Sequence, residues 1–86
     1  MQLKDVQAVS GETLKVSNQW AAECEKRGTT VSLSVWESSD GATVTAALSG
    51  TLATGTFSPT CDSTLTNTVT LANGEVLKAL RRVRLN

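Results

Sequence analysis

The chain has 86 residues, with eight basic and eight acidic side chains, two cysteines and no histidine. This length allows one domain with a thin core, and the balanced charge argues against a general nucleic-acid binder, which would be basic overall. The missing histidine excludes Ser-His-Asp and Cys-His catalytic systems and removes the commonest metal ligand. Residues 1–10 have no apolar stretch long enough for a signal peptide or a membrane span. We therefore expect a soluble, non-enzymatic protein made in the cytoplasm, with no cofactor and no contact with membrane or nucleic acid.

The two cysteines, Cys24 and Cys61, leave the question of a disulfide open. A bridge between sheets is typical of secreted sandwich domains, whereas cytoplasmic proteins keep their thiols reduced. Without an export signal we favour two reduced thiols, each packing as a small apolar side chain. Two cysteines without histidine cannot form the usual four-ligand zinc site, so we expect no metal.

The N-terminal part predicts two extended segments. Residues 3–9 carry an imperfect apolar alternation, and the Ser10-Gly11 pair that follows is typical of a turn. Residues 13–17 alternate cleanly and predict a half-buried strand.

Residues 18–27 fit two structures. Asn18 could cap a short helix, but the alternation of Trp20, Ala22 and Cys24 fits a strand equally well. We favour the strand, with residues 25–28 as a charged turn. In either case we expect Trp20 in the core, because so small a domain needs its largest side chains inside.

Residues 31–36 predict the clearest strand of the first half. Val31, Leu33 and Val35 alternate with polar residues and define an inner face. Trp36 has the opposite parity, so it either packs on a second layer or serves as an interface anchor, a role that tryptophan often fills. Asp40-Gly41 then marks a turn of the kind found in hairpins.

The second half predicts further strands separated by turns. Residues 51–63 are weakly patterned, and Phe57 is their only large apolar side chain, which indicates one short strand flanked by loops. Asn73-Gly74 is a strong hairpin turn. The remaining strands cover residues 43–48, 65–71 and 76–85; in the second of these, Leu65, Val69 and Leu71 share a face with Asn67.

The last strand contains a defect. Val83 and Leu85 share parity with Leu77 and Ala79, but Arg81 interrupts that face. A β-bulge near residues 81–82 would reverse the phase and reconcile the pattern. Alternatively, Leu80 is an exposed contact residue on a docking face.

This end of the chain is also basic. Residues 75–86 carry four basic side chains and one acidic side chain, a net charge of +3, which leaves −3 for the remainder. A charged edge strand that resists aggregation would explain it, and so would a surface that docks on an acidic partner. With Trp36 added as a possible anchor, the candidate partner-binding residues are Lys78, Arg81, Arg82, Arg84 and Trp36.

About seven short strands with frequent turns predict an all-β, antiparallel β-sandwich that forms a single domain over residues 1–86. Residues 1–11 have the weakest pattern and form either a strand of the sandwich or an extended arm that is exchanged with a neighbouring subunit.

The same residues carry a resemblance over residues 13–86. The chain has a tryptophan, an apolar residue four positions later, and a Ser-rich strand that ends in a second tryptophan. It closes with Asn-x-Val-Thr, a glycine, and alternating Arg and apolar residues. This pattern resembles that of the small immunoglobulin-like virion proteins of tailed bacteriophages. Three features depart from that pattern. Cys24 stands in place of a larger apolar residue, the turn at residues 25–28 is longer than usual, and Arg81 stands where an apolar residue is expected. The matching positions are Trp20, Cys24, Val31, Trp36, Asn67, Val69, Gly74, Val83 and Leu85.

The resemblance implies an immunoglobulin-like sandwich and a structural role in the virion. A protein of this kind would decorate or cement the capsid by docking on the major capsid protein, as a small homo-oligomer on the particle. The same resemblance allows a tail, neck or fibre component, or a module that binds a receptor or carbohydrate on the host surface. An intracellular phage protein that binds a host factor is a further alternative.

Overall fold

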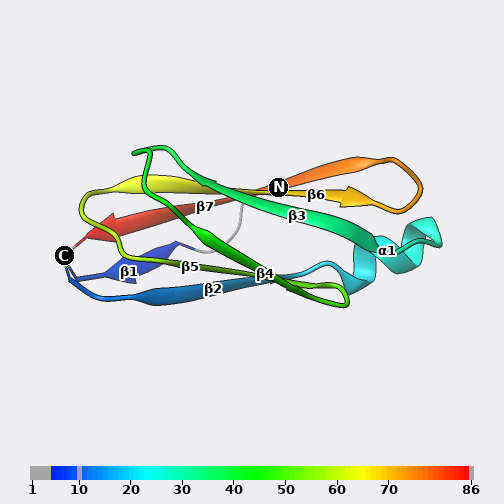
Figure 1. The fold of residues 1–86 in the computed structure, drawn as a ribbon, viewed down its shortest axis with the longest axis horizontal. Coiled ribbons are helices and arrows are strands. Elements are labelled where there is room, and N and C mark those ends of the chain that lie inside the picture. Colours follow the sequence, from blue (N-terminus) through cyan, green and yellow to red (C-terminus); the bar gives the residue numbers. More distant parts are fainter. Residues whose placement is uncertain (1–4, 10, 86) are drawn as a thin grey trace.

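Two sheets pack face to face in the computed structural model, which describes residues 5–9 and 11–85 (Figure 1). The strands are β1 (Val6–Ala8), β2 (Leu14–Gln19), β3 (Val31–Ser38), β4 (Thr45–Ser49), β5 (Leu52–Phe57), β6 (Ser63–Leu71) and β7 (Val76–Leu85), and a short helix, α1 (Ala21–Arg27), follows β2. One sheet has the order β1-β7-β6-β3 and the other β2-β5-β4. The chain is thus an all-β sandwich of seven strands in two sheets, so the predicted all-β sandwich is confirmed.

The described part of residues 1–11 is a strand of this sandwich, which is one of the two alternatives that the sequence left open. Val6, Gln7 and Ala8 pair in parallel with Val83, Arg84 and Leu85 of β7 in the same chain. It is the one parallel pair among the described strands; the other pairings are antiparallel. Residues 1–4 and 10, which belong to the same predicted arm and turn, lie outside the described residues.

The preference for a strand over residues 18–27 was wrong. β2 ends at Gln19, and α1 begins at Ala21 after Trp20, without a cap from Asn18. The Gln19 Oε1 atom instead accepts a hydrogen bond from the backbone N–H of Ala21, at 3.0 Å. Gly28 ends the helix in the left-handed conformation, with φ of 60°, which glycine adopts without steric cost.

A β-bulge in β3 reverses the face predicted for this strand. Val31 is buried, but the register with β6 shifts between Val31 and Leu33. Leu33 and Val35 therefore face solvent, and Trp36 lies in the core with 6% of its surface exposed. The indole packs on the backbone of Gly55: a Cβ atom there would lie 2.8 Å from Trp36 Cδ2. Trp36 is a core residue rather than an exposed interface anchor.

The bulge predicted near residues 81–82 is absent from the structure. β7 pairs with β6 in one continuous register from Val76 to Val83, and its side chains alternate strictly between the two faces. Arg81 points between the sheets and Leu80 points outward, with 36% of its surface exposed.

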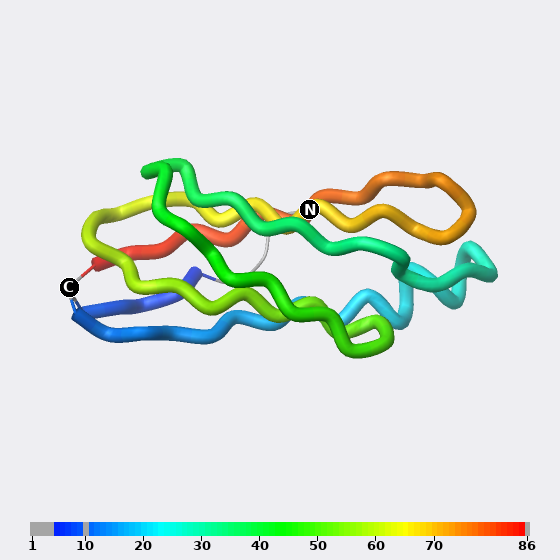
Figure 2. The backbone as a smooth tube through the Cα atoms, in the orientation of Figure 1, coloured from blue at the N-terminus to red at the C-terminus, as the bar shows by residue number. Residues whose placement is uncertain are grey.

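The other strands of the second half are confirmed as β4, β5 and β6. The turn at Asp40-Gly41 does not form a hairpin, because the chain crosses there from β3 in one sheet to β4 in the other (Figure 2). Asn73-Gly74 does form the β6–β7 hairpin, and Gly74 has a φ of 94°. Both cysteines are free; Cys24 is buried as expected, whereas Cys61 is exposed.

A layer of buried polar side chains divides the core in two. Asn67 is fully buried, and its Oδ1 atom accepts hydrogen bonds from Asn18 Nδ2, at 3.1 Å, and Trp20 Nε1, at 3.0 Å. Its Nδ2 group donates to Ser34 Oγ, at 3.0 Å, and to the carbonyl oxygen of Val35, at 3.1 Å. One apolar cluster lies on the α1 side of this layer (Trp20, Cys24, Val31, Ala53, Val69, Leu71 and Ala79), and the other lies beyond it (Ala8, Val16, Trp36, Phe57, Leu65 and Val83).

Candidate docking surface

The outer face of the four-stranded sheet combines apolar and threonine side chains in neighbouring rows. The register places Leu33, Thr70 and Val76 side by side on β3, β6 and β7. The next rows of this face are Val35, Thr68 and Lys78, and then Glu37, Thr66 and Leu80. We call these nine residues the threonine face.

The apolar side chains of the threonine face are well exposed. The exposed fractions are 55% for Leu33, 40% for Val35, 56% for Val76 and 36% for Leu80. Single exposed apolar residues are common on protein surfaces, but a group that shares one face marks an interaction site more often. In the first of these rows, Thr70 of β6 lies between two of these apolar side chains, Leu33 of β3 and Val76 of β7.

Basic side chains extend from this face along β7. Lys78, Arg82 and Arg84 all have the outward parity of that strand and are exposed. The guanidinium of Arg84 lies 3.2 Å from the carboxylate of Asp5, next to β1. Glu37, on β3, is the acidic residue of the threonine face itself. The structure therefore brings together three of the four basic residues that the sequence indicated.

Arg81, the fourth basic residue, has a different place. Its Nη2 group donates to Asn18 Oδ1, at 2.9 Å, and to the carbonyl oxygen of Ser17, at 3.3 Å. Since Asn18 in turn donates to Asn67, Arg81 extends the buried polar layer towards the sandwich edge. Arg81 and Trp36 are therefore absent from the surface that Lys78, Arg82 and Arg84 share.

The apolar half of the threonine face was missed by the sequence analysis. Leu33 and Val35 were assigned to the core because they alternate with serines, and only the bulge after Val31 turns them outward. A usable signal was present in β6, where Thr64, Thr66, Thr68 and Thr70 alternate with apolar residues and Asn67. A strand with that pattern has one uncharged outer face.

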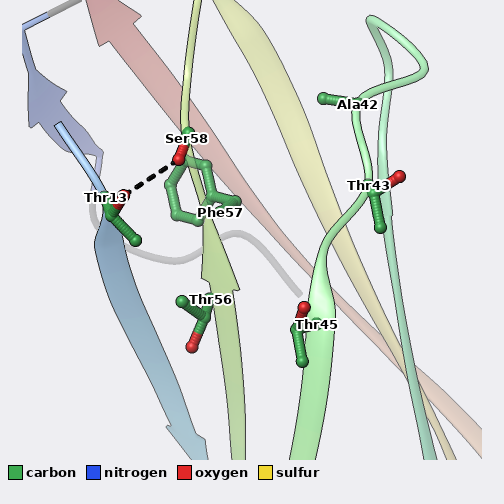
Figure 3. Close-up of a pocket in the computed structure, with 7 residues that line it drawn as sticks. All are labelled: Thr13, Ala42, Thr43, Thr45, Thr56, Phe57 and Ser58. Carbon is green, nitrogen blue, oxygen red and sulfur yellow. Dashed lines mark hydrogen bonds between the residues drawn. The ribbon is translucent and has the colours of Figure 1, made fainter. Parts of the chain in front are cut away.

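A shallow cavity lies elsewhere, between the segment that leads into β4 and the neighbouring ends of β2 and β5 (Figure 3). Its volume is about 400 Å³, and the Oγ atoms of Thr13 and Ser58 lie 3.1 Å apart at its rim. Its lining contains hydroxyl and apolar groups but no ionisable side chain: Thr13, Ala42, Thr43, Thr45, Thr56, Phe57 and Ser58. The cavity therefore provides no acid or base for catalysis.

The exposed thiol is not an activated nucleophile. Cys61 Sγ lies 3.5 Å from the Asp40 carboxylate, and this hydrogen bond raises the pKa of the thiol. The hydroxyl of Ser38 and the backbone N–H of Ala42 in turn lower the pKa of Asp40. A thiol beside a carboxylate stays protonated, whereas nucleophilic cysteines need a lowered pKa.

Among the residues that the structure describes, no group of three or more Asp, Glu and Cys side chains is arranged to hold a metal ion. Within the same residues, no helix has both the length and the apolar character needed to cross a membrane. In comparisons with known proteins, no family model matches this chain and no curated protein matches it either.

Proposed function

We propose that this protein is a non-enzymatic structural component of a tailed-phage virion, and that it docks on the major capsid protein through the threonine face. The observation that carries the proposal is the group of exposed apolar side chains beside three basic ones on one sheet. Covering such a face removes apolar surface from water. The resemblance of residues 13–86 to phage immunoglobulin-like proteins supports the choice of partner.

The chemistry of the face defines the partner surface. Interfaces have apolar centres and polar rims, and complementary charges guide the encounter of the two proteins. Leu33, Val35, Val76 and Leu80 would form the apolar part of the interface. Lys78 would lie between Val76 and Leu80, and Arg82 and Arg84 would lie beyond them along β7. The matching partner has an apolar patch bordered by Asp or Glu residues.

The burial of every aromatic side chain counts against carbohydrate recognition. Trp20, Trp36 and Phe57 are the only aromatic residues of the chain, and their exposed fractions are 1%, 6% and 4%. Aromatic rings that stack on a ligand must be exposed. Capsid docking therefore ranks above the host-surface alternative, whereas a tail or neck component would differ only in its protein partner.

Co-sedimentation with undecorated phage capsids tests the proposal. The informative variant is Lys78→Glu/Arg82→Glu, which reverses two charges on the outer face of β7. The matched control is Lys15→Glu/Lys26→Glu, which makes the same change in net charge on β2 and α1, away from this face. Arg81 is left unchanged, because it holds Asn18 inside the sandwich.

We expect saturable binding of the wild-type protein and of the control, and at least tenfold weaker binding of the β7 variant. Equal binding of both variants would remove the threonine face as the docking surface. If the wild-type protein does not bind capsids, the capsid assignment is wrong, and the same assay with purified tails and with host lysate proteins distinguishes the remaining alternatives.

A further inference from the structure

The edge strand β4 lacks the features that normally protect a sheet edge. Proteins discourage pairing at open edges with very short strands, charged side chains, prolines or bulges. β1 has three residues, β2 carries Lys15, and β3 has both a bulge and Glu37. β4 has none of these: it pairs with β5 in an unbroken register over five residues, and all five of its side chains are exposed.

The uncharged character extends well beyond β4. No Asp, Glu, Lys or Arg occurs in residues 41–61, a stretch that covers the last four residues of the loop before β4, the β4–β5 hairpin and the whole of β5. The eight basic and eight acidic residues all lie elsewhere in a chain of 86. This edge of the sandwich therefore has no charged side chain of its own that would repel an approaching strand.

The inner side of β4 is also incompletely covered. Ala46 and Leu48 pair with Gly55 and Ala53 of β5, both of which point into the core and are buried. Ala46 and Leu48 share that inward parity but are exposed, Leu48 to 39%. The edge thus combines unpaired backbone groups with core-facing apolar side chains that still contact water.

We propose that two copies of this chain pair antiparallel along β4, which joins their three-stranded sheets into one continuous sheet of six strands. With Ala47 opposite its own counterpart, Thr45 faces Ser49 and Ala46 faces Leu48 of the second copy. The hydroxyl side chains then lie together on the outer face, and the apolar side chains lie together on the inner face. Cross-strand pairs of like character stabilise a sheet.

The lack of charge favours a second copy over a foreign strand. In a two-fold pairing of identical strands, the central residue faces its own counterpart, and the residues next to it lie diagonally across from theirs. A charge in the middle of the strand would therefore lie close to the like charge of the second copy and weaken the pair. A foreign partner imposes no such condition, because an opposite charge could complement it. β4 suits pairing with its own copy, because it carries no charge, its two ends are Thr and Ser, and its centre is Ala.

Charge substitutions at the two-fold position test this pairing. Ala47 is exposed on the outer face of β4, so Ala47→Lys and Ala47→Glu alter the edge without changing the core. Ala22→Lys, at an exposed position of α1, is the matched control. The readout is molar mass by size-exclusion chromatography with light scattering, over a range of concentrations, with circular dichroism as the check on folding. It uses the protein alone and so does not depend on the proposed docking function.

We expect the wild-type protein and Ala22→Lys to have twice the 9.0 kDa mass of one chain as concentration rises. Each Ala47 variant should remain a folded monomer, and an equimolar mixture of Ala47→Lys and Ala47→Glu should recover the dimer, because opposite charges then face each other. A wild-type protein that is monomeric at every concentration would overturn the proposal. So would a dimer that survives Ala47→Lys, or a mixture that stays monomeric.

Discussion

Asn67 shows how one buried polar residue organises this small core. Its side-chain amide makes four hydrogen bonds, which join β2, the Trp20 indole, β3 and β6. Buried polar groups that are fully hydrogen-bonded specify one arrangement of the surrounding elements, and each becomes costly when its partner is lost. Arg81 extends the same layer to β7, so this layer connects strands of both sheets.

Replacing Asn67 with leucine should destabilise the protein far more than its similar volume implies. The substitution leaves Trp20 Nε1, the Asn18 amide and the Val35 carbonyl without their partner, and we expect a loss of about 3–5 kcal/mol in the free energy of unfolding. Urea titration followed by circular dichroism measures it. Thr54→Val is the control, because it removes an exposed hydrogen bond to Ser17 and should cost less than about 1 kcal/mol. Equal losses in the two variants would contradict this role for Asn67.

At the scale of elements, α1 is fixed to the β6–β7 hairpin by an ion-paired arginine. Arg27 lies 2.7 Å from Glu23 on its own helix and 3.0 Å from Glu75 in the hairpin turn. Figure 1 shows α1 and this turn at the same end of the molecule. The hydrogen bond from Arg27, followed by that from the Asn73 side chain, lowers the pKa of Glu75. The element that sequence analysis mistook for a strand is therefore held in place by contacts remote in sequence.

This pair predicts a pH-dependent contribution to stability. Because the folded-state pKa of Glu75 lies below its unfolded value, the stabilisation is present above the unfolded pKa and is lost as pH falls through the folded pKa. Glu75→Gln should therefore lower the thermal midpoint slightly at neutral pH and have no effect at about pH 2, where the carboxylate is protonated. Glu25→Gln, an exposed position on α1, should leave the midpoint unchanged at both pH values. A deficit in Glu75→Gln that persists in acid would show that the charge is not its cause.

Local sequence pattern was sufficient to predict some elements of this fold but not others. Residues 65–71 and 76–85 flank the Asn73-Gly74 turn, so local pattern was sufficient for the extent of β6 and β7. It was not sufficient for the interior of β7, where the bulge expected near residues 81–82 is absent and Arg81 bonds to Asn18 instead. The seven residues of α1 fit helix and strand periods alike, and the bulge after Val31 leaves no local mark that distinguishes it from a regular strand. The basic half of the candidate surface followed from charge alone. Its apolar half depended on that bulge, and the inward position of Arg81 depended on the buried Asn18.

At the scale of the whole molecule, the polar layer separates two apolar clusters that each contain one tryptophan. Trp20 belongs to the cluster beside α1, and Trp36 belongs to the other. The long strands β6 and β7, of nine and ten residues, contribute side chains to both clusters. Strands shared in this way couple the two halves, because neither half can lose its packing without disturbing strands that the other half needs.

We therefore expect the two halves to unfold in a single transition, which the tryptophans can report separately. Trp36→Phe leaves Trp20 as the only indole, and Trp20→Phe leaves Trp36. In each variant, the urea midpoint from tryptophan fluorescence should coincide with that from far-UV circular dichroism, as two-state unfolding requires. Trp20→Phe should have the lower midpoint because it also removes the hydrogen bond to Asn67. If fluorescence and circular dichroism gave separate midpoints in either variant, the polar layer would be a boundary between two independently unfolding halves, and the coupling through β6 and β7 would be too weak to join them.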